Sequence, residues 1–395
     1  ANQLGKRSRH IDDSHAFIDA SGFVMYSNES KSDKHIVNLN VPDGWRSVSG
    51  LDFGKNEHQF IADNFDVLID SPIETGINQL HKFKVDGRNY ELVIWGKGNY
   101  DVEKMLDDLK ALVQQSEAIW QGYPFERYVF MVHATSGARG ATEHLNSTII
   151  QRSRYSFSER KDYLGFLATA AHEFVHTWNV KAYRPKGLVP YDYQQENYSN
   201  LIWLSEGSTS YLQYQLLTRG GLISAKELMD NLAKRVAAYM ETPGTKVQSV
   251  AEGSFDTWMK SDSHFAKNHS VGIYAEGYMA SWLLDYQILQ DTNLEKSYKD
   301  VHNELYQNYK LPYGFTENDV QAVIQKVTGK NYADWWKANI LSPMKPNFEQ
   351  MLSQAGLELV KGDKQKPWTG ITAKRVESGM GINYVAKDSP AWQAG

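Results

Sequence analysis

Two histidines and one glutamate have the spacing of a metal hydrolase site. His172, Glu173 and His176 spell H-E-x-x-H. Glu173 is the only formally charged residue in the stretch 163–180. On a helix, His172 and His176 lie one turn apart on the same face, so both imidazoles can reach one metal ion. Glu173 lies beside them, where it can take a proton from a metal-activated water. The motif therefore predicts a zinc hydrolase.

Coincidence and ordinary core packing are the alternatives to a metal site. With 12 histidines in 395 residues and a glutamate frequency of roughly 0.06, an uncorrelated chain would contain H-E-x-x-H about 0.02 times. Two histidines and a carboxylate could also satisfy one another by ordinary hydrogen bonds in a core. A buried carboxylate without a charged partner is costly, however, and this favours the metal site.

A catalytic zinc site needs a third protein ligand and an open fourth position. Glu206 is the sole formal charge in the stretch 198–218, inside an apolar segment with the spacing of a buried helix. A lone carboxylate in such surroundings needs a cation. His172, His176 and Glu206 would form a two-histidine, one-glutamate set. The chain has no cysteine, which excludes a thiolate ligand and a structural cysteine-type zinc site.

The composition is that of a globular protein with several cores. A length of 395 residues allows two or three domains, and 41% hydrophobic residues with 11 Trp, 23 Tyr and 15 Phe can fill their cores. The 42 basic and 47 acidic residues give a net charge of -5 without a long run of one sign. We therefore expect no nucleic-acid or membrane partner, and a peptide or small-molecule substrate.

The sequence indicates less about the ends of the chain and about the cellular compartment than about the composition of its cores. No segment approaches the roughly 18 apolar residues that span a bilayer. The start at Ala1 lacks an initiator Met and the apolar region of a signal peptide, so we expect a chain shortened at both ends. A cysteine-free chain fits the periplasm and the cytoplasm equally, and the oligomeric state also stays open.

Periodicity divides the chain into three parts. Residues 1–98 have the alternation and turn signals of a β domain, and residues 99–350 become mostly helical after a helix that starts near Asp101. Residues 351–395 change again to short strands followed by a helix that Ser389 caps. The individual strands that we expect are FVMY (23–26), HIVNLNV (35–41), FDVLI (65–69), a hairpin turning at Asp86-Gly87, YVFMVHA (128–134), TGITAKRV (369–376) and GINYVA (381–386).

The segments around the ligands resemble those of a known family. HEFVHTWNVKAYRP (172–185) and ENYSNLIWLSEGSTSYL (196–212) resemble the glycyl aminopeptidases, which are gluzincin zinc metallopeptidases. The resemblance covers nearly the whole chain. It implies a multidomain α+β fold with an N-terminal β domain, a thermolysin-like and mostly helical catalytic domain, and the start of a C-terminal PDZ-like domain. The long gap between His176 and Glu206 is similar to the family's arrangement.

A second motif of the family lies upstream. RGATEHLNST resembles the family's glycine-rich E-H motif, which is related to the exopeptidase motif of the aminopeptidase N family. By that analogy Glu143 binds the substrate's α-amino group, and Gly140 and Ala141 contribute to the first substrate pocket. A fixed carboxylate that faces an ammonium distinguishes a chain terminus from a continuous peptide. A surface carboxylate in a turn is the alternative. Ala141 and Thr142 replace the usual Gly and Leu, which alters the expected shape of the pocket.

A third segment, SVGIYAEGYMASWLLD, is similar to the part of the family that carries a tyrosine before a helix. Tyr274 matches that tyrosine and could donate to the oxyanion that forms in the transition state. Packing in a core is the alternative, and Tyr278 is a second candidate donor. Three neighbours depart from the family's Ser, Tyr and Lys: Gly272, Ile273 and Glu276.

Supporting residues are expected around the metal ligands. Many gluzincins orient a histidine with an Asp four residues after the glutamate ligand, but that position here is Ser210. Orientation would then come from Ser210, from Asn179 or from a backbone carbonyl. We expect His144 to be a structural hydrogen-bonding residue, and Lys181 and Arg184 to form salt bridges and complement the helix dipole.

Together these features predict an aminopeptidase with one Zn²⁺ and with Glu173 as general base. The resemblance implies a preference for small first residues such as Gly or Ala. One alternative is a zinc endopeptidase or another zinc hydrolase on the same scaffold, which would accept an N-acetylated substrate. Another is a non-catalytic peptide-binding protein in which the PDZ-like tail matters, which would stay inert with zinc bound.

Overall fold

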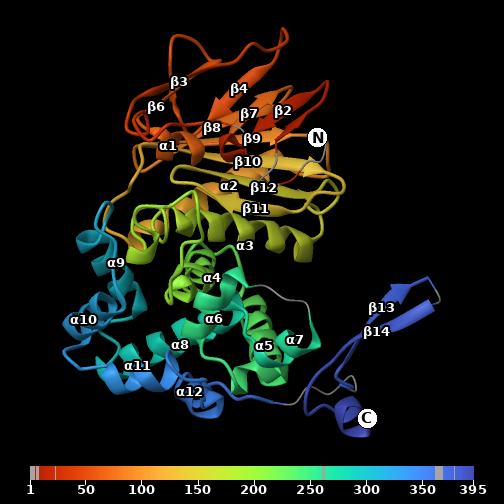
Figure 1. Cartoon of the computed structure of the whole chain (residues 1–395), viewed down its shortest axis with the longest axis vertical. Coiled ribbons are helices and arrows are strands. Elements are labelled where there is room, and N and C mark those ends of the chain that lie inside the picture. The colour runs from red at the N-terminus through yellow and green to blue at the C-terminus, as the bar shows by residue number, and fades with distance from the viewer. Residues whose placement is uncertain (1–4, 6–8, 23, 260–262, 361–367, 378) are drawn as a thin grey trace. The chain divides into compact units, whose positions relative to one another are not determined.

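The computed structural model describes residues 5, 9–22, 24–259, 263–360, 368–377 and 379–395. The chain divides into two compact units (Figure 1). The first unit consists of Ala1–Ala182 and Gln213–Ile223, and the second of Tyr183–Leu212 and Ser224–Gly395.

The described residues of the first unit form three β sheets (Figure 1). Their strand orders are β1-β2-β7-β4, β3-β6-β5 and β11-β12-β10-β9-β8. In the five-stranded sheet, β10 pairs in parallel with both β9 and β12, whereas the two outer strands β8 and β11 are antiparallel to their neighbours. The strand bounds are β1 His10–Ile11, β2 His15–Ile18, β3 His35–Asn38, β4 Arg46–Ser49, β5 Asp52–Phe53, β6 Gln59–Ala62, β7 Ile73–Gly76, β8 Gln79–Val85, β9 Arg88–Trp95, β10 Arg127–Thr135, β11 Gly140–Glu143 and β12 Ser147–Ser153.

An apolar core joins the four-stranded and the five-stranded sheets. Phe17 of β2 and Val48 of β4 form one buried cluster with Val93, Val129 and Ile149 of β9, β10 and β12. All five side chains are at most 1% exposed. Burial of this apolar area stabilises the unit and fixes the position of the β10–β12 region.

Helix α3 (Arg160–His176) carries the H-E-x-x-H motif and contacts β11 and β12. Phe166, Ala170 and Phe174 recur every four residues and are fully buried. The ring of Phe174 packs edge-on against Tyr128 of β10, with centroids 5.1 Å apart. These contacts hold the apolar face of α3 and leave the histidines on another face.

The other elements of the first unit include two more helices. Helix α2 (Val102–Val113) begins after Asp101, whose side chain accepts a hydrogen bond from the backbone N–H of Lys104. This confirms the helix that the sequence predicts near Asp101.

The predicted hairpin is also present. Asp86 and Gly87 have φ values of 49° and 78° and form the turn between β8 and β9.

Two of the predicted strands near the N-terminus are wrong. Residues 65–69 form helix α1 (Phe65–Ile69), because the side chain of Asn64 caps it by accepting from the N–H of Val67. The stretch 24–26 has no strand, and Phe23 lies outside the described residues. In HIVNLNV the strand covers only His35–Asn38.

The second unit is mostly helical in its described residues, as the periodicity predicts. Helix α4 (Ile202–Arg219) begins in this unit and ends in the first. No helix among the described residues is long and apolar enough to span a membrane. The remaining bounds are α5 Ala225–Glu241, α6 Val250–Phe255, α7 His264–His269, α8 Ile273–Asp291, α9 Tyr298–Asn308, α10 Glu317–Thr328, α11 Ala333–Asn339 and α12 Phe348–Gln354.

A close helix contact organises this unit. Gly207 of α4 and Gly277 of α8 touch through their backbones, since a Cβ on Gly207 would lie 2.3 Å from Cα of Gly277. Only residues without side chains allow helices to approach so closely. The contact fixes the stretch of α4 that carries Glu206 against the first turns of α8.

The C-terminal strands and helix agree with the sequence predictions. Strands β13 (Ile371–Val376) and β14 (Gly379–Val385) pair antiparallel, and α13 (Pro390–Ala394) follows Ser389, which accepts from the N–H of Trp392. The PDZ-like identity of this segment stays a prediction. The domain boundaries at residues 98 and 350 also stay predictions. Strand β9 precedes residue 98 and β10 follows it, and the two strands pair in one sheet.

Candidate active site

The two histidines of the motif face one another. Nε2 of His172 lies 3.1 Å from Nε2 of His176, and the rings are nearly perpendicular. His176 is 1% exposed and Glu173 is 6% exposed. The helix thus brings both imidazoles and the neighbouring carboxylate to one largely buried place.

The second ring nitrogen, Nδ1, of each of these two histidines has a hydrogen-bond acceptor. Nδ1 of His176 lies 2.8 Å from the backbone oxygen of Asn179, and Nδ1 of His172 lies 2.8 Å from Oε1 of Gln213. An oxygen of either kind only accepts, so each Nδ1 carries the proton and donates. Both Nε2 atoms then present lone pairs toward each other. This arrangement fits a cation between the rings, because the edge of a tetrahedron of nitrogen ligands about zinc is about 3.3 Å.

Glu143 also converges on this place. One ligand atom each of Glu143, Glu173 and His176 lie within 4.8 Å of one another. Glu143 ends the edge strand β11, opposite Thr148 of β12, and β11 contacts α3. Burial raises the pKa of the Tyr128 phenol well above its usual value, and the charges of Glu173 and Glu143 raise it further. The carboxylate from the upstream motif therefore lies beside the H-E-x-x-H residues.

Gly140 and Ala141, the other two residues predicted to bind substrate, lie on the same edge strand. Ala141 pairs with Ile150 and Gly140 with Gln151 of β12. Gly140 has φ 141°, a backbone conformation that favours glycine. The strand that ends at Glu143 therefore begins at a residue whose backbone requires glycine.

A partly buried ion pair supports the loop after Glu143. Nδ1 of His144 lies 3.3 Å from Oδ1 of Asp70, and Nζ of Lys181 lies 2.5 Å from the same oxygen. The N–H of Leu145 donates to the other oxygen. Burial opposes the charge of Asp70, but Lys181 and His144 outweigh it and hold the pKa of this carboxyl well below its usual range. The structural role predicted for His144 and the salt bridge predicted for Lys181 are confirmed.

Glu206 lies on α4, on the same helical face as Gln213. Seven residues of an α-helix make almost two full turns, so the two side chains project in nearly the same direction, about 10 Å apart along the axis. Ser210, one of the predicted supports, is buried between them on this face. Glu206 thus shares a helix and a face with the residue that holds His172.

The two candidate tyrosines are on α8 of the second unit. Tyr274 is 51% exposed in the first turn and borders a cavity of about 640 Å³ formed by α6, α7 and the start of α8. Tyr278 is 4% exposed, and the guanidinium of Arg235 lies 4.1 Å from its ring centre. Tyr274 is therefore the more accessible donor.

Sequence reasoning missed Gln213 and Asp70. Gln213 could have been found from its spacing, because it lies seven residues after Glu206 and is 7% exposed despite its polar side chain. Asp70 carried no such signal, since it precedes Lys181 by more than a hundred residues. The sequence left open whether Ser210, Asn179 or a backbone carbonyl orients a histidine ring. In the structure the backbone oxygen of Asn179 lies 2.8 Å from Nδ1 of His176.

Known proteins share this fold and these segments. The crystal structure of an aminopeptidase N family protein from Idiomarina loihiensis superposes with a TM-score of 0.91 at 24% identity, covering 100% of this chain and 72% of that chain. No curated protein sequence matches this chain. Residues 165–280 match the M61 glycyl aminopeptidase family, and residues 1–77 match the Peptidase M61 N-terminal domain. The chain belongs to the M61 glycyl aminopeptidase family.

This M61 assignment confirms the family predicted from the sequence. It makes the protein a peptidase, with a peptide as substrate. The α+β fold with an N-terminal β domain and a helical domain is confirmed as well. The 165–280 match contains the H-E-x-x-H motif in the later part of α3, all of α4 with Glu206, and the first turns of α8.

Proposed function

We propose that this M61 protein is a zinc-dependent aminopeptidase that removes N-terminal residues from peptides and prefers small first residues such as Gly or Ala. The observation that carries the proposal is the convergence of Glu143 and Glu173 on His176, beside two imidazoles whose Nε2 atoms face each other. A carboxylate for the substrate's amino group and a carboxylate for proton transfer are then both close to the metal ligands.

His172, His176 and Glu206 would hold the zinc ion. The tautomers fixed by Gln213 and Asn179 support the two nitrogen ligands. The position of Glu206 two turns before Gln213, on one continuous helix, supports the third. A set of two histidines and one glutamate leaves a position open for substrate or water, as catalysis requires. When bound, zinc supplies Lewis-acid chemistry that polarises a carbonyl and acidifies a water molecule.

Glu173 would move the proton. Its side chain is almost buried on α3, next to His172, and its position suits a base that takes a proton from the attacking water. The same carboxyl then delivers that proton to the leaving amine, so that the peptide bond breaks and the carboxylate is regenerated. Because bulk water is largely excluded around Glu173, the electrostatic interactions of its carboxylate are stronger than they would be in water.

Glu143 would select the substrate and Tyr274 would stabilise the transition state. The Glu143 carboxylate accepts hydrogen bonds from the α-ammonium and so places the first peptide bond at the reacting groups. The phenol of Tyr274, exposed at the start of α8, donates to the oxyanion as it forms. The Gly140–Ala141 segment beside Glu143 contributes to the pocket for the first side chain.

We also propose the domain organisation expected from the sequence. Residues 1–98 would be an N-terminal β domain, residues 99–350 the zinc peptidase domain and residues 351–395 the start of a PDZ-like domain. The antiparallel pair β13–β14 and the capped helix α13 support the last of these.

The test compares glycyl and alanyl amides with their N-acetylated forms, using protein that is treated with a chelator and then reloaded with Zn²⁺. The expected result is cleavage of the free-amine substrates alone, lost without zinc and restored by it. Equal cleavage of blocked substrates would show an endopeptidase. A zinc-loaded protein that is inert across a broad peptide panel would favour the peptide-binding alternative.

A further inference from the structure

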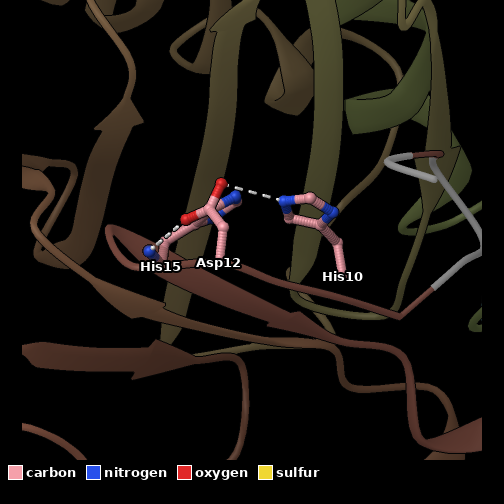
Figure 2. A group of neighbouring side chains, drawn as sticks. All are labelled: His10, Asp12 and His15. Carbon is pink, nitrogen blue, oxygen red and sulfur yellow. Dashed lines mark hydrogen bonds and ion pairs between the residues drawn. The ribbon is translucent and has the colours of Figure 1, made fainter. Parts of the chain in front are cut away.

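Three potential metal ligands lie at the turn between β1 and β2, within the first unit. Figure 2 shows the side chains of His10 and Asp12 pointing toward one another, with His15 next to Asp12. Strands β1 and β2 pair with His10 opposite Phe17. The turn between them, which contains Asp12, therefore brings a histidine from each strand to the same end of the hairpin.

The ligand atoms are close enough to share one ion. Nε2 of His10 lies 3.1 Å from Oδ2 of Asp12, and one ligand atom each of His10, Asp12 and His15 lie within 4.8 Å of one another. Ligand atoms bound at about 2.0–2.2 Å to one zinc ion are separated by a little over 3 Å. The described residues thus need only small side-chain adjustments to coordinate an ion here.

The Asp12 carboxylate is held in place. Its Oδ1 accepts from the N–H and the hydroxyl of Ser14, both at 2.8 Å, and from the N–H of His15. Its Oδ2 lies 3.1 Å from Nε2 of His10. Three hydrogen bonds therefore fix the carboxylate so that Oδ2 faces His10.

His15 offers a buried nitrogen with no partner. The side chain is 0% exposed, its ring stacks on Trp95 with centroids 3.5 Å apart, and its Nε2 has no hydrogen-bond partner among the described residues. Its Nδ1 lies 3.0 Å from Oε1 of Glu74. Buried nitrogens of this kind are normally satisfied, so the orphaned Nε2 indicates a missing ligand.

The hydrogen bonds around Glu74 indicate which ring nitrogen of His15 carries the proton and which carries the lone pair. Nε2 of Gln151 can only donate, and it lies 3.3 Å from Nδ1 of His133, so the proton of His133 is on Nε2 and is donated to Oε2 of Glu74 at 2.8 Å. A carboxylate at Glu74 also accepts from Nδ1–H of His15. Nε2 of His15 is then unprotonated, which is the form that binds a metal ion.

Glu74 connects His15 with His133. It is 0% exposed, and its two carboxyl oxygens lie 3.0 Å from Nδ1 of His15 and 2.8 Å from Nε2 of His133. A divalent cation on His15 would face this carboxyl group through the ring, in the carboxylate–histidine–metal arrangement that orients ligands in known metal sites.

We propose that His10, Asp12 and His15 bind a second divalent transition-metal ion of the zinc type, with Glu74 and His133 orienting His15. Two imidazoles and one carboxylate favour zinc and its neighbours over Mg²⁺ or Ca²⁺. The ion enters from solvent beside Asp12, whose side chain is 36% exposed, whereas that of His10 is 10% exposed. The site clamps the β1–β2 hairpin and is independent of the H-E-x-x-H residues.

The experiment counts zinc per chain by elemental analysis after the full chain is stripped with a chelator, reloaded with Zn²⁺ and freed of excess ion. The unsubstituted protein should hold two zinc ions. The double variant H10Q/D12N should hold one and keep its peptidase activity. H172Q/H176Q should also hold one but lose activity. H81Q, which removes an unrelated histidine of the same unit, should still hold two.

The outcomes separate this proposal from the proposed function. If H10Q/D12N still held two ions, the second site would be overturned. It would also be overturned if the unsubstituted protein held one ion and H172Q/H176Q held none. Either result would leave the proposed catalytic site intact.

A hydrogen-exchange measurement tests the clamp on the hairpin. Zinc bound at this site should make residues 10–18 more resistant to exchange. Equal protection in the stripped and reloaded proteins would contradict the clamp. Displacement of the ion by equimolar Mg²⁺ would contradict the zinc type.

Discussion

Oε1 of Gln213 lies 2.8 Å from Nδ1 of His172, on the side of the ring opposite the nitrogen that faces His176. The contact fixes the tautomer of His172 and joins α4 to the face of α3 that carries the two proposed histidine ligands. Because Glu206 precedes Gln213 by two turns on one face of α4, this hydrogen bond also relates the proposed third ligand to the first two.

Replacing Gln213 by Leu should weaken zinc binding by about 10- to 100-fold, because His172 loses the acceptor that orients it. Competition with a chromophoric chelator measures the affinity. Gln213→Glu keeps an acceptor and should stay within a few-fold of the unsubstituted protein. Gln215→Leu, on another face of α4, should leave the affinity unchanged, and an equal loss in this control would show that the effect is not specific.

Replacing Glu143 by Gln should lower kcat/KM for free-amine substrates by about 10- to 100-fold, since a charged hydrogen bond to the ammonium is lost. Any low rate on the N-acetylated substrate should not fall with it. Steady-state kinetics on the matched pair of substrates gives the ratio. An unchanged preference for the free amine would remove Glu143 from substrate recognition.

The parts of this structure that local sequence determines were predictable. The spacing of His172 and His176 sets their shared face, and Asp86-Gly87 sets its turn, because each depends on residues a few positions apart. The short segment at 65–69 was misread as a strand, because its apolar residues suit either element and the Asn64 cap decides for a helix.

Contacts between distant segments could not be predicted in the same way. Gln213 reaches His172 across 41 positions and Asp70 reaches Lys181 across 111. Each depends on how helices and loops pack, which no local pattern specifies. The convergence of Glu143 with Glu173 was expected from the family resemblance alone, and β11 provides its structural basis by pairing with β12 next to α3.

Replacing Gly207 by Ala should lower the free energy of unfolding by about 1–3 kcal/mol, because the added Cβ would overlap the backbone of Gly277. Denaturant titration measures the change. Gly165→Ala is the matched helical control: its Cβ would make only an ordinary 3.5 Å contact with Arg152, so it should be neutral or slightly stabilising. A neutral Gly207→Ala would contradict the close contact of α4 and α8.

Glu276→Gln should remove a pH dependence of stability. Burial raises the pKa of Glu276 to about 8, so between pH 4.5 and 8 the folded protein holds a proton that the unfolded chain has lost. Stability contributed by this group therefore falls as pH rises through that window, by something on the order of 4 kcal/mol. Glutamine does not titrate and avoids this loss.

The measurement for Glu276 is the difference in unfolding free energy between variant and unsubstituted protein at pH 5 and at pH 8. The variant should gain relative stability at the higher pH. A difference that is the same at both values would show that Glu276 ionises normally in the folded protein.

The most direct test of the account is the zinc content and turnover of Glu173→Gln on a free-amine glycyl or alanyl substrate. The substitution keeps the shape of the side chain and leaves His172, His176 and Glu206 in place, so the zinc content should equal that of the unsubstituted protein. Turnover should fall by about 100- to 10,000-fold, because the group that moves the proton is gone. Near-normal turnover with zinc bound would contradict the account.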